Sequence, residues 1–321
     1  MQVSQKDQMD KQDAKNKEIM NNKLKARVIT KPDRTHTFKG IVILLFSGLG
    51  FTISMLIASR ALKDEIDLNT SNAIRHGVAT IIMIIYQKAC SKKIGLLPRE
   101  RYISLALGIS VFMMGIGYLG ATQYIPISLA VLIFYTCPFF VAIISRFTEN
   151  EPITPRRLTA IIIAFIGLSL ALKVQTTGGL QLLGIMYAVI AAIGFASFVT
   201  VSSLMLKTAD PQAVLLHSMA GGTLLFVLFF VLTNGVEIIG TRTGWLKVSG
   251  SGIAIAFAYI TFFAGMKIIG PVKATMILNI EPVLTICLAA ILFGEHLANI
   301  QVFGAVLVIG GIVLITRTPK T

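Results

Sequence analysis

The chain has 321 residues, of which 55% are apolar and only 14% are charged, and its mean hydropathy is +0.78. Because a typical soluble domain carries roughly 25% charged residues, this composition excludes a soluble globular protein and predicts that lipid solvates part of the surface. The net charge of +14 does not indicate a nucleic-acid partner, because the basic residues separate apolar runs instead of forming one basic face with interleaved aromatic residues. Attraction to anionic lipid at the cytoplasmic surface explains them better.

The chain begins with a polar segment, 1–38, which is rich in Lys, Asp, Asn and Gln. It has no apolar core of the kind found in signal peptides, so it is expected to be a cytoplasmic tail without stable structure. Ten apolar segments follow, each close to the roughly 20 residues that a membrane-spanning helix needs: 40–59, 70–87, 103–121, 125–145, 158–173, 180–204, 212–233, 250–266, 272–294 and 298–316. These runs are too long for strands and lack period-two alternation, which excludes a β-barrel and predicts an all-α polytopic membrane protein.

The basic residues predict how the ten helices are oriented. If the N-terminus is inside, 23 of the 29 Lys and Arg fall in inside segments and six fall outside. Omitting the N-terminal tail, which counts for little under the positive-inside rule, still leaves 13 against six. Both termini are therefore expected to be cytoplasmic, in a multi-pass protein of the plasma or inner membrane.

The two halves of the chain resemble each other. A shift of 144 residues, without gaps, matches residues that have special backbone roles: Gly40 with Gly184, Gly50 with Gly194, Gly77 with Gly221, Gly108 with Gly252, Pro138 with Pro282 and Gly167 with Gly311. Each half would hold five spans, and because five is odd the second half enters the membrane from the opposite side. The pattern predicts two inverted repeats, 39–173 and 174–317, which is typical of secondary transporters.

One stretch resembles a known family. Residues 274–313 read ATMILNIEPVLTICLAAILFGEHLANIQVFGAVLVIGGIVL, with Glu-Pro, an apolar run that ends in Gly-Glu, and a Gly-rich last helix. This is similar to the second repeat of the EamA family in the drug/metabolite transporter superfamily, and 130–172 resembles the first repeat with Cys137-Pro138 in place of Glu-Pro. The resemblance implies a central cavity between helices 1–4 and 6–9, and a substrate among amino acids, other metabolites or drugs.

Glu281 is the only Asp or Glu deep inside an apolar segment. An acid at that depth costs roughly 2.5–3.5 kcal/mol on insertion scales unless it is protonated, paired or hydrated. It is a candidate proton, cation or cationic-substrate site; alternatively, its protonated form bonds backbone freed beside Pro282. Pro138 and Pro282 stand at matched positions, and each frees a carbonyl four residues earlier, at Phe134 and Leu278. Such helix breaks line many transporter sites, although a kink also serves packing alone.

Three basic side chains are further candidates. Arg75 opens the second span and matches an Arg of the family pattern, where it can meet a substrate carboxylate through two parallel hydrogen bonds. It can equally extend to the membrane interface. His76 and His217 can titrate near neutral pH, and the alternative for both is an ordinary interfacial or packed histidine.

The remaining candidates are hydroxyl and amide side chains within the apolar segments: Thr52, Ser128, Tyr135, Ser197, Thr275 and Asn279. Ser128 and Tyr135 are seven residues apart and therefore share one helical face. Asn279 and Glu281 lie about 200° apart on a regular helix, so they share a cavity only if the helix unwinds near Pro282. The alternative for each hydroxyl is a hydrogen bond to its own helix backbone.

The sequence contains no catalytic or nucleotide-binding motif: it has no Walker A loop, no GxSxG and no HExxH. The three cysteines, Cys90, Cys137 and Cys287, are far apart, so neither a disulfide nor a metal site is expected, and no cofactor is expected. The prediction is a non-enzymatic permease, in particular an exporter, that moves a small metabolite with a proton as a coupling-ion candidate.

Two alternatives stay open at this stage. A lipid or lipid-linked-sugar flippase on the same fold would show a lateral opening toward lipid. An intramembrane enzyme would need at least two polar catalytic groups at one depth, which the single acid Glu281 disfavours. The oligomeric state is also open, a homo-oligomer included.

Overall fold

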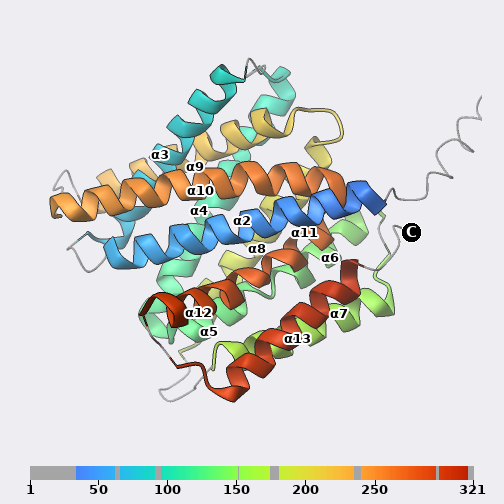
Figure 1. Ribbon diagram of the computed structural model, residues 1–321. Helices are drawn as coiled ribbons and strands as arrows, with labels where there is room; N and C mark the ends of the chain where they lie inside the picture. The colour runs from blue at the N-terminus through green and yellow to red at the C-terminus, as the bar shows by residue number, and fades with distance from the viewer. Residues whose placement is uncertain are drawn as a thin grey trace, which may run out of the picture.

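The computed structural model describes residues 34–61, 66–90, 95–150, 152–173, 181–234, 240–293 and 296–316, and all their regular secondary structure is helical (Figure 1). The helices are α2 (Arg34–Ala61), α3 (Leu68–Ala89), α4 (Pro98–Tyr124), α5 (Ile127–Phe134), α6 (Cys137–Thr148), α7 (Pro155–Ala171), α8 (Leu182–Met205), α9 (Pro211–Asn234), α10 (Arg242–Ile269), α11 (Pro271–Leu278), α12 (Ile280–Phe293) and α13 (Asn299–Thr316). The expected tail lies almost wholly outside the described residues. The first helix nevertheless begins at Arg34, earlier than the apolar pattern predicts.

Eight helical stretches among the described residues are long and apolar enough to cross a membrane. Apolar side chains also point away from the bundle, as on the outer face of α9, where Leu224, Leu228 and Leu232 are 68%, 52% and 75% exposed at a spacing of four residues. These features establish an all-helical integral membrane protein. Two of the ten expected segments miss the criteria: α3 carries a polar first half, and α7 has only 17 residues.

The two helix breaks expected from the prolines are present. The chain leaves the helical path at Tyr135 and Thr136, between α5 and α6, and at Asn279, between α11 and α12. The helices before the breaks end at Phe134 and Leu278, the residues whose carbonyls Pro138 and Pro282 release. A shift of 144 residues also relates the starts of α5 and α11, Ile127 and Pro271. The sequence repeat is therefore repeated in the helix boundaries.

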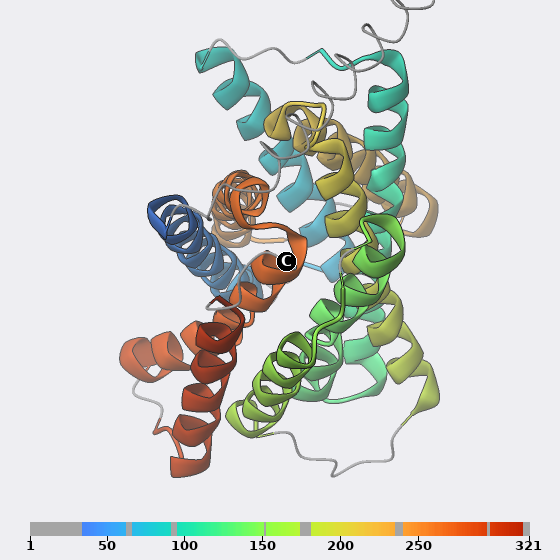
Figure 2. The same ribbon diagram turned by 90° about the vertical axis from the view of Figure 1, so that its right-hand side faces the viewer.

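Helix packing follows the same repeat. The α2 helix packs on α10 and α4 packs on α8; α4 also packs on α9 and α3 on α10; α7 packs on α13 and α3 on α9. Figures 1 and 2 show α2 beside α10, and α7 beside α13 at one edge of the bundle. Exchanging each helix of α2–α7 with its counterpart in α8–α13 converts the α2–α10 pair into the α8–α4 pair, and the α4–α9 pair into the α10–α3 pair. The same exchange leaves the α7–α13 and α3–α9 pairs unchanged. Reciprocal contacts of this kind characterise a two-fold relation.

Glycines show the exchange at single residues. A Cβ on Gly50 would lie 3.1 Å from Ala258, and a Cβ on Gly194 would lie 3.2 Å from Met114. Subtracting 144 from 258 gives 114, so the two contacts are exchanged copies of one another. The same exchange relates Gly40 beside Ile269 to Gly184 beside Ile125, Gly108 beside Gly222 to Gly252 beside Val78, and Gly167 beside Val308 to Gly311 beside Ala164. Matched glycines thus bring matched helices into close contact.

Candidate functional site

A cavity of about 650 Å³ lies between the two halves of the bundle. Its wall combines residues of α2–α6 with residues of α8, α10, α11 and α12. It reaches from the helix breaks to one end of the bundle, where it is lined by residues close to helix termini: Ala58, Thr122, Ile127 and Leu172. We call this the distal end; the terminal end is the one where α2 begins and α13 finishes, on the right of Figure 1. The cavity is thus displaced toward the distal end.

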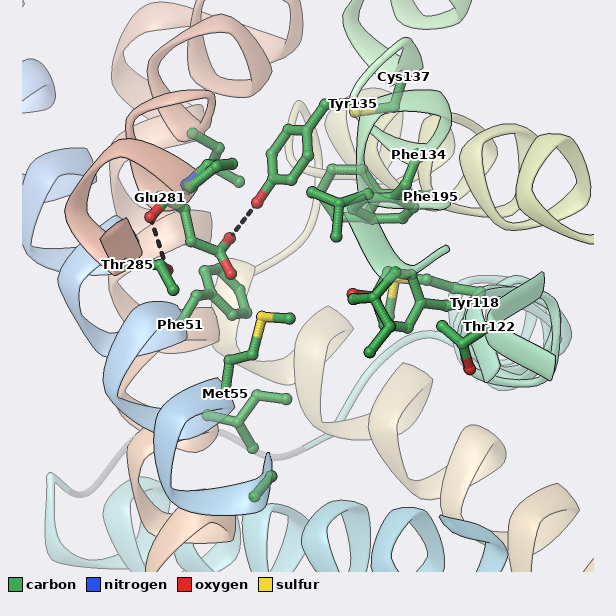
Figure 3. Close-up of a pocket in the computed structure, with 18 of the residues that line it drawn as sticks. Phe51, Met55, Tyr118, Thr122, Phe134, Tyr135, Cys137, Phe195, Glu281 and Thr285 are labelled. Atoms are coloured by element: carbon green, nitrogen blue, oxygen red, sulfur yellow. Dashed lines mark hydrogen bonds between the residues drawn. The ribbon is translucent and has the colours of Figure 1, made fainter. Parts of the chain in front are cut away.

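Glu281 and Tyr135 meet across the cavity from the two broken helices. The Tyr135 hydroxyl donates a hydrogen bond to Oε2 of Glu281 at 2.7 Å (Figure 3). Glu281 stands in the first turn of α12, and Tyr135 is the first residue after α5. The two breaks therefore bring a phenol and a carboxyl of different repeats together at the level where the chain is not helical.

The backbone around Glu281 is fixed by two hydroxyls. Thr52 on α2 donates to the Glu281 carbonyl oxygen at 3.2 Å, and Thr285, one turn later in α12, donates to the same oxygen at 2.9 Å. Figure 3 shows the Thr285 bond beside the carboxyl group. These contacts hold the main chain of α12 while the acidic side chain projects into the cavity.

Arg75 brings a positive charge to the same cavity. Its Nη2 donates to Oγ of Ser54 at 3.2 Å, and Ser54 is itself bonded to α10, with its Oγ 2.9 Å from the Ser251 carbonyl oxygen. Within the described residues Nε of Arg75 has no hydrogen-bond partner. Arg75, Glu281 and Tyr118 all line this cavity. The guanidinium is therefore positioned by one anchor and keeps donors for a ligand.

His76 offers a complementary group. Its Nδ1 lies 2.9 Å from the carbonyl oxygen of Asn72, which can only accept, so Nδ1 carries the proton in the neutral ring. Its Nε2 is then an acceptor, and it is buried with no partner among the described residues. The ring packs on Phe226 with a centroid distance of 4.7 Å. The cavity wall thus includes the carboxyl of Glu281, the guanidinium of Arg75 and the ring of His76, whose Nε2 acceptor is buried.

Aromatic and sulfur-containing side chains form most of the remaining wall. Phe51 and Met55 from α2 face Tyr118 and Thr122 from α4 across the hollow, and Phe195 from α8 lies beside Phe134 (Figure 3). In the part of the chain that the structure describes, no three His, Cys, Asp or Glu side chains cluster closely enough for a metal ion. The site is thus an apolar chamber with few polar groups, a composition typical of small-molecule pockets.

Comparison with protein families identifies the chain. The model of the EamA-like transporter family matches it twice, over residues 38–173 and 182–317. The chain belongs to the EamA-like transporter family. Each match spans one half of the chain, and together they include every described helix except the first residues of α2.

Several relatives of this EamA-like chain are transporters by name. An uncharacterized transporter of Archaeoglobus fulgidus is 25% identical over 87% of this chain and 99% of its own length. A protein named S-adenosylmethionine uptake transporter, from Rickettsia felis, is 26% identical over 68% of this chain and 73% of its own length. A crystal structure with 18% identity has a TM-score of 0.75 and covers 86% of this chain and 96% of that chain, which shows a shared fold.

The sequence candidates of this EamA-like protein divide into two groups. On the cavity wall lie Glu281, Tyr135, Arg75, His76, Ser128 and Pro282. Off the wall lie Thr52, Pro138, Ser197, His217, Thr275 and Asn279. Thr275 and His217 bond to their own helices, at 3.0 Å to the Pro271 carbonyl oxygen and 2.8 Å to the Ala213 carbonyl oxygen. Although the helix does break at Asn279, that residue is buried beside the cavity and does not line it.

Sequence reasoning missed Ser54, Tyr118 and Asn72. Tyr118 and Asn72 line the cavity, and Ser54 anchors Arg75. The sequence gives one indication of Ser54: it is a polar residue in an apolar segment, one helical turn after Phe51 and therefore on a similar face of the helix. Its role nevertheless depends on Ser251, which is 197 residues away, and that contact is visible only in the folded chain.

Proposed function

We propose that this protein is a secondary permease that carries a small organic metabolite, an amino acid or a related compound, through the centre of the bundle by alternating access. In this proposal ten helices cross the cell membrane as two inverted five-helix repeats, and both termini are cytoplasmic. Export, the direction expected in the sequence analysis, stays a prediction.

The cavity between the repeats is the observation that carries the proposal. Its volume of about 650 Å³ lies inside the range of roughly 300–1,000 Å³ that small-molecule sites occupy. Arg75 can hold a carboxylate, Glu281 can hold an ammonium group, and the wall around Phe51 and Phe195 can hold an apolar side chain. An amino acid carries these three groups on one small molecule.

The exchanged contacts support the inverted arrangement. Pairs such as Gly50 with Ala258 and Gly194 with Met114 relate the halves by a two-fold exchange. With five spans in each half, an axis of this kind lies in the membrane plane, which is the arrangement found in many secondary transporters. Two halves with equivalent packing can trade conformations, so that a site between them faces each side in turn.

A flux assay tests the proposal. The protein is reconstituted in liposomes, and labelled amino acids and related metabolites are screened with and without a pH gradient. We expect saturable transport of at least one solute that carries a carboxylate. Movement of labelled lipid between leaflets without transport of any water-soluble solute would replace the permease by the flippase alternative.

A matched pair of variants tests the role of the cavity. Removing a charge-assisted hydrogen bond of about 1.5–3 kcal/mol weakens binding about tenfold or more. Arg75→Gln should therefore raise the half-saturating concentration of the carboxylate substrate by that factor, and Arg101→Gln, an exposed arginine at the start of α4, should not. Equal behaviour of both variants would remove Arg75 from the binding site.

A further inference from the structure

The internal repeat assigns a counterpart to every residue of the cavity wall. For four pairs of residues both members line the cavity: Phe51 with Phe195, Gly115 with Tyr259, Phe134 with Leu278, and Cys137 with Glu281. These pairs mark the centre, where the two halves meet at equivalent positions. The counterparts of the other wall residues fall outside the cavity, on the side of the terminal end.

Those outer counterparts are packed shut. Ala58, Asn72, Arg75, Tyr118 and Val131 on the wall correspond to Ser202, Leu216, Met219, Phe262 and Thr275. The five counterparts are 0%, 4%, 0%, 0% and 1% exposed. All the remaining counterparts are buried as well, apart from Ala220 and Thr316, which are half-buried. The repeat counterparts of the cavity-wall residues therefore form one closed region of the bundle.

The closed region contains polar atoms without partners. The hydroxyl of Ser202 and Oδ1 of Asn279 are buried and have no hydrogen bond within the described ranges. Buried polar atoms are nearly always hydrogen-bonded, so two such atoms in one packed region call for an explanation. Both atoms would be hydrogen-bonded to water if the region opens in another conformation.

Ionic and polar contacts close the region at the terminal end. Lys207, in the connection between α8 and α9, lies 3.0 Å from Glu149 at the end of α6, so the contact joins the two repeats. The neighbouring Thr208 donates to Glu100 at the start of α4 at 2.9 Å. In the ion pair the Lys207 side chain is 59% exposed and the Glu149 side chain is 7% exposed, so the pair lies at the edge of the packed region.

We infer that this closed region is a latent passage, lined by Ser202, Leu216, Met219, Phe262, Thr275 and Asn279, through which the cavity opens toward the terminal end. The inference rests on the proposed transport function. The passage is more apolar than the open half, because Met219, Leu216 and Phe262 replace Arg75, Asn72 and Tyr118. It accepts water and the apolar part of a small solute, while the guanidinium contact exists only in the distal half.

Serine-to-cysteine variants test the passage with little change in side-chain size. In a background with the three native cysteines replaced by alanine, Ser202→Cys reports the passage and Ser128→Cys reports the open cavity. Ser218→Cys is the matched control, since Ser218 is also 0% exposed and its counterpart, Ile74, does not line the cavity. The probe is a membrane-impermeant maleimide, added to proteoliposomes from either face after the orientation of each preparation has been determined.

We expect Ser202→Cys to react only from the face that holds the termini, Ser128→Cys only from the other face, and Ser218→Cys from neither. Met219→Cys, deeper in the passage, gives the same test if Ser202→Cys does not fold. Lys207→Gln removes the exposed cation of the pair with Glu149, which should raise labelling of Ser202→Cys at least about twofold and lower labelling of Ser128→Cys.

Absence of labelling at both Ser202→Cys and Met219→Cys, with Ser128→Cys reactive, would overturn the inference. Equal labelling of Ser202→Cys and Ser218→Cys would also overturn it, because it would show general loosening. A different outcome would contradict the proposed function and not the passage. One-sided labelling of Ser202→Cys in a protein that moves none of the screened solutes would keep the passage and refute the proposed substrate class.

Discussion

The hydrogen bond between Tyr135 and Glu281 offers the sharpest test of a coupling proton. Tyr135→Phe removes the hydroxyl that lies 2.7 Å from Oε2 of Glu281 and keeps the ring, which is buried and packs edge-on against Phe134 at 5.4 Å between centroids. The variant should fold, since only one polar atom is lost. Its effect is therefore confined to the energy of one hydrogen bond.

The magnitude depends on the charge of the acceptor. A hydrogen bond to an ionised group contributes about 1.5–3 kcal/mol, and a neutral one about 0.5–1.5 kcal/mol. The tyrosine donates and therefore stabilises the ionised carboxylate, so its removal favours the protonated acid. Because the variant loses the bond in both protonation states, the shift follows from the difference of about 1–1.5 kcal/mol between the two bonds. At about 1.36 kcal/mol per pH unit, the pH midpoint of transport moves upward by about one pH unit.

The assay is exchange of labelled substrate at equal pH on both sides of the liposome, repeated over a series of pH values. Tyr124→Phe is the control, because Tyr124 stacks on Tyr187 at 6.0 Å between centroids and does not line the cavity. An unchanged midpoint in a folded Tyr135→Phe protein would refute the reasoning, and so would an equal shift in Tyr124→Phe. Either result would separate the Tyr135 hydrogen bond from the pH dependence of transport.

Further predictions address the acid, the packing and the topology. Glu281→Gln mimics the protonated acid, so exchange should survive while uphill transport driven by a pH gradient is lost; gradient-driven transport at the wild-type level would exclude a coupling role. Gly304→Ala should lower the melting temperature in detergent by an amount equivalent to about 1–3 kcal/mol, because its Cβ would lie 2.4 Å from the Ala171 nitrogen, whereas Gly310→Ala, with nothing within 4 Å, should not. Fused at Thr321, a reporter active only in the cytoplasm should give signal, and fused at Asn234 it should not; signal at both or at neither would contradict an inverted repeat.

The helical class and the breaks could be predicted from sequence because both depend on local properties. Long apolar runs can satisfy their backbone in lipid only as helices or closed barrels, and the lack of alternation excluded barrels. Pro138 and Pro282 each remove a backbone donor, so the ends of α5 and α11 at Phe134 and Leu278 follow from proline geometry. The helix α3 was harder to assign, because its first half is polar where it faces the cavity.

The direction in which each side chain faces could not be predicted, because it depends on how the helices rotate against one another. Phe51 lines the cavity, and the adjacent Thr52 is fully buried against the backbone of Glu281. Asn279 sits at the break itself and is buried, yet it does not line the cavity. The residue pattern of an apolar segment does not separate these cases, because lipid and the protein interior select the same residue types.

The two repeats share the residues that determine helix packing, but they do not share the charged residues of the cavity. Under the 144-residue shift glycines coincide with glycines and prolines with prolines. In contrast, Glu281 corresponds to Cys137, and Met219 corresponds to Arg75. Insertion scales set the cost of an uncompensated charge in an apolar span at roughly 2.5–3.5 kcal/mol. If both halves carried the same charged groups, one set would be buried in the closed half in every conformation. A single arginine and a single acid, both next to the centre, avoid that cost in the conformation described here. In the opposite conformation Arg75 would be enclosed, and its charge would then need Glu281 or a substrate carboxylate as a partner.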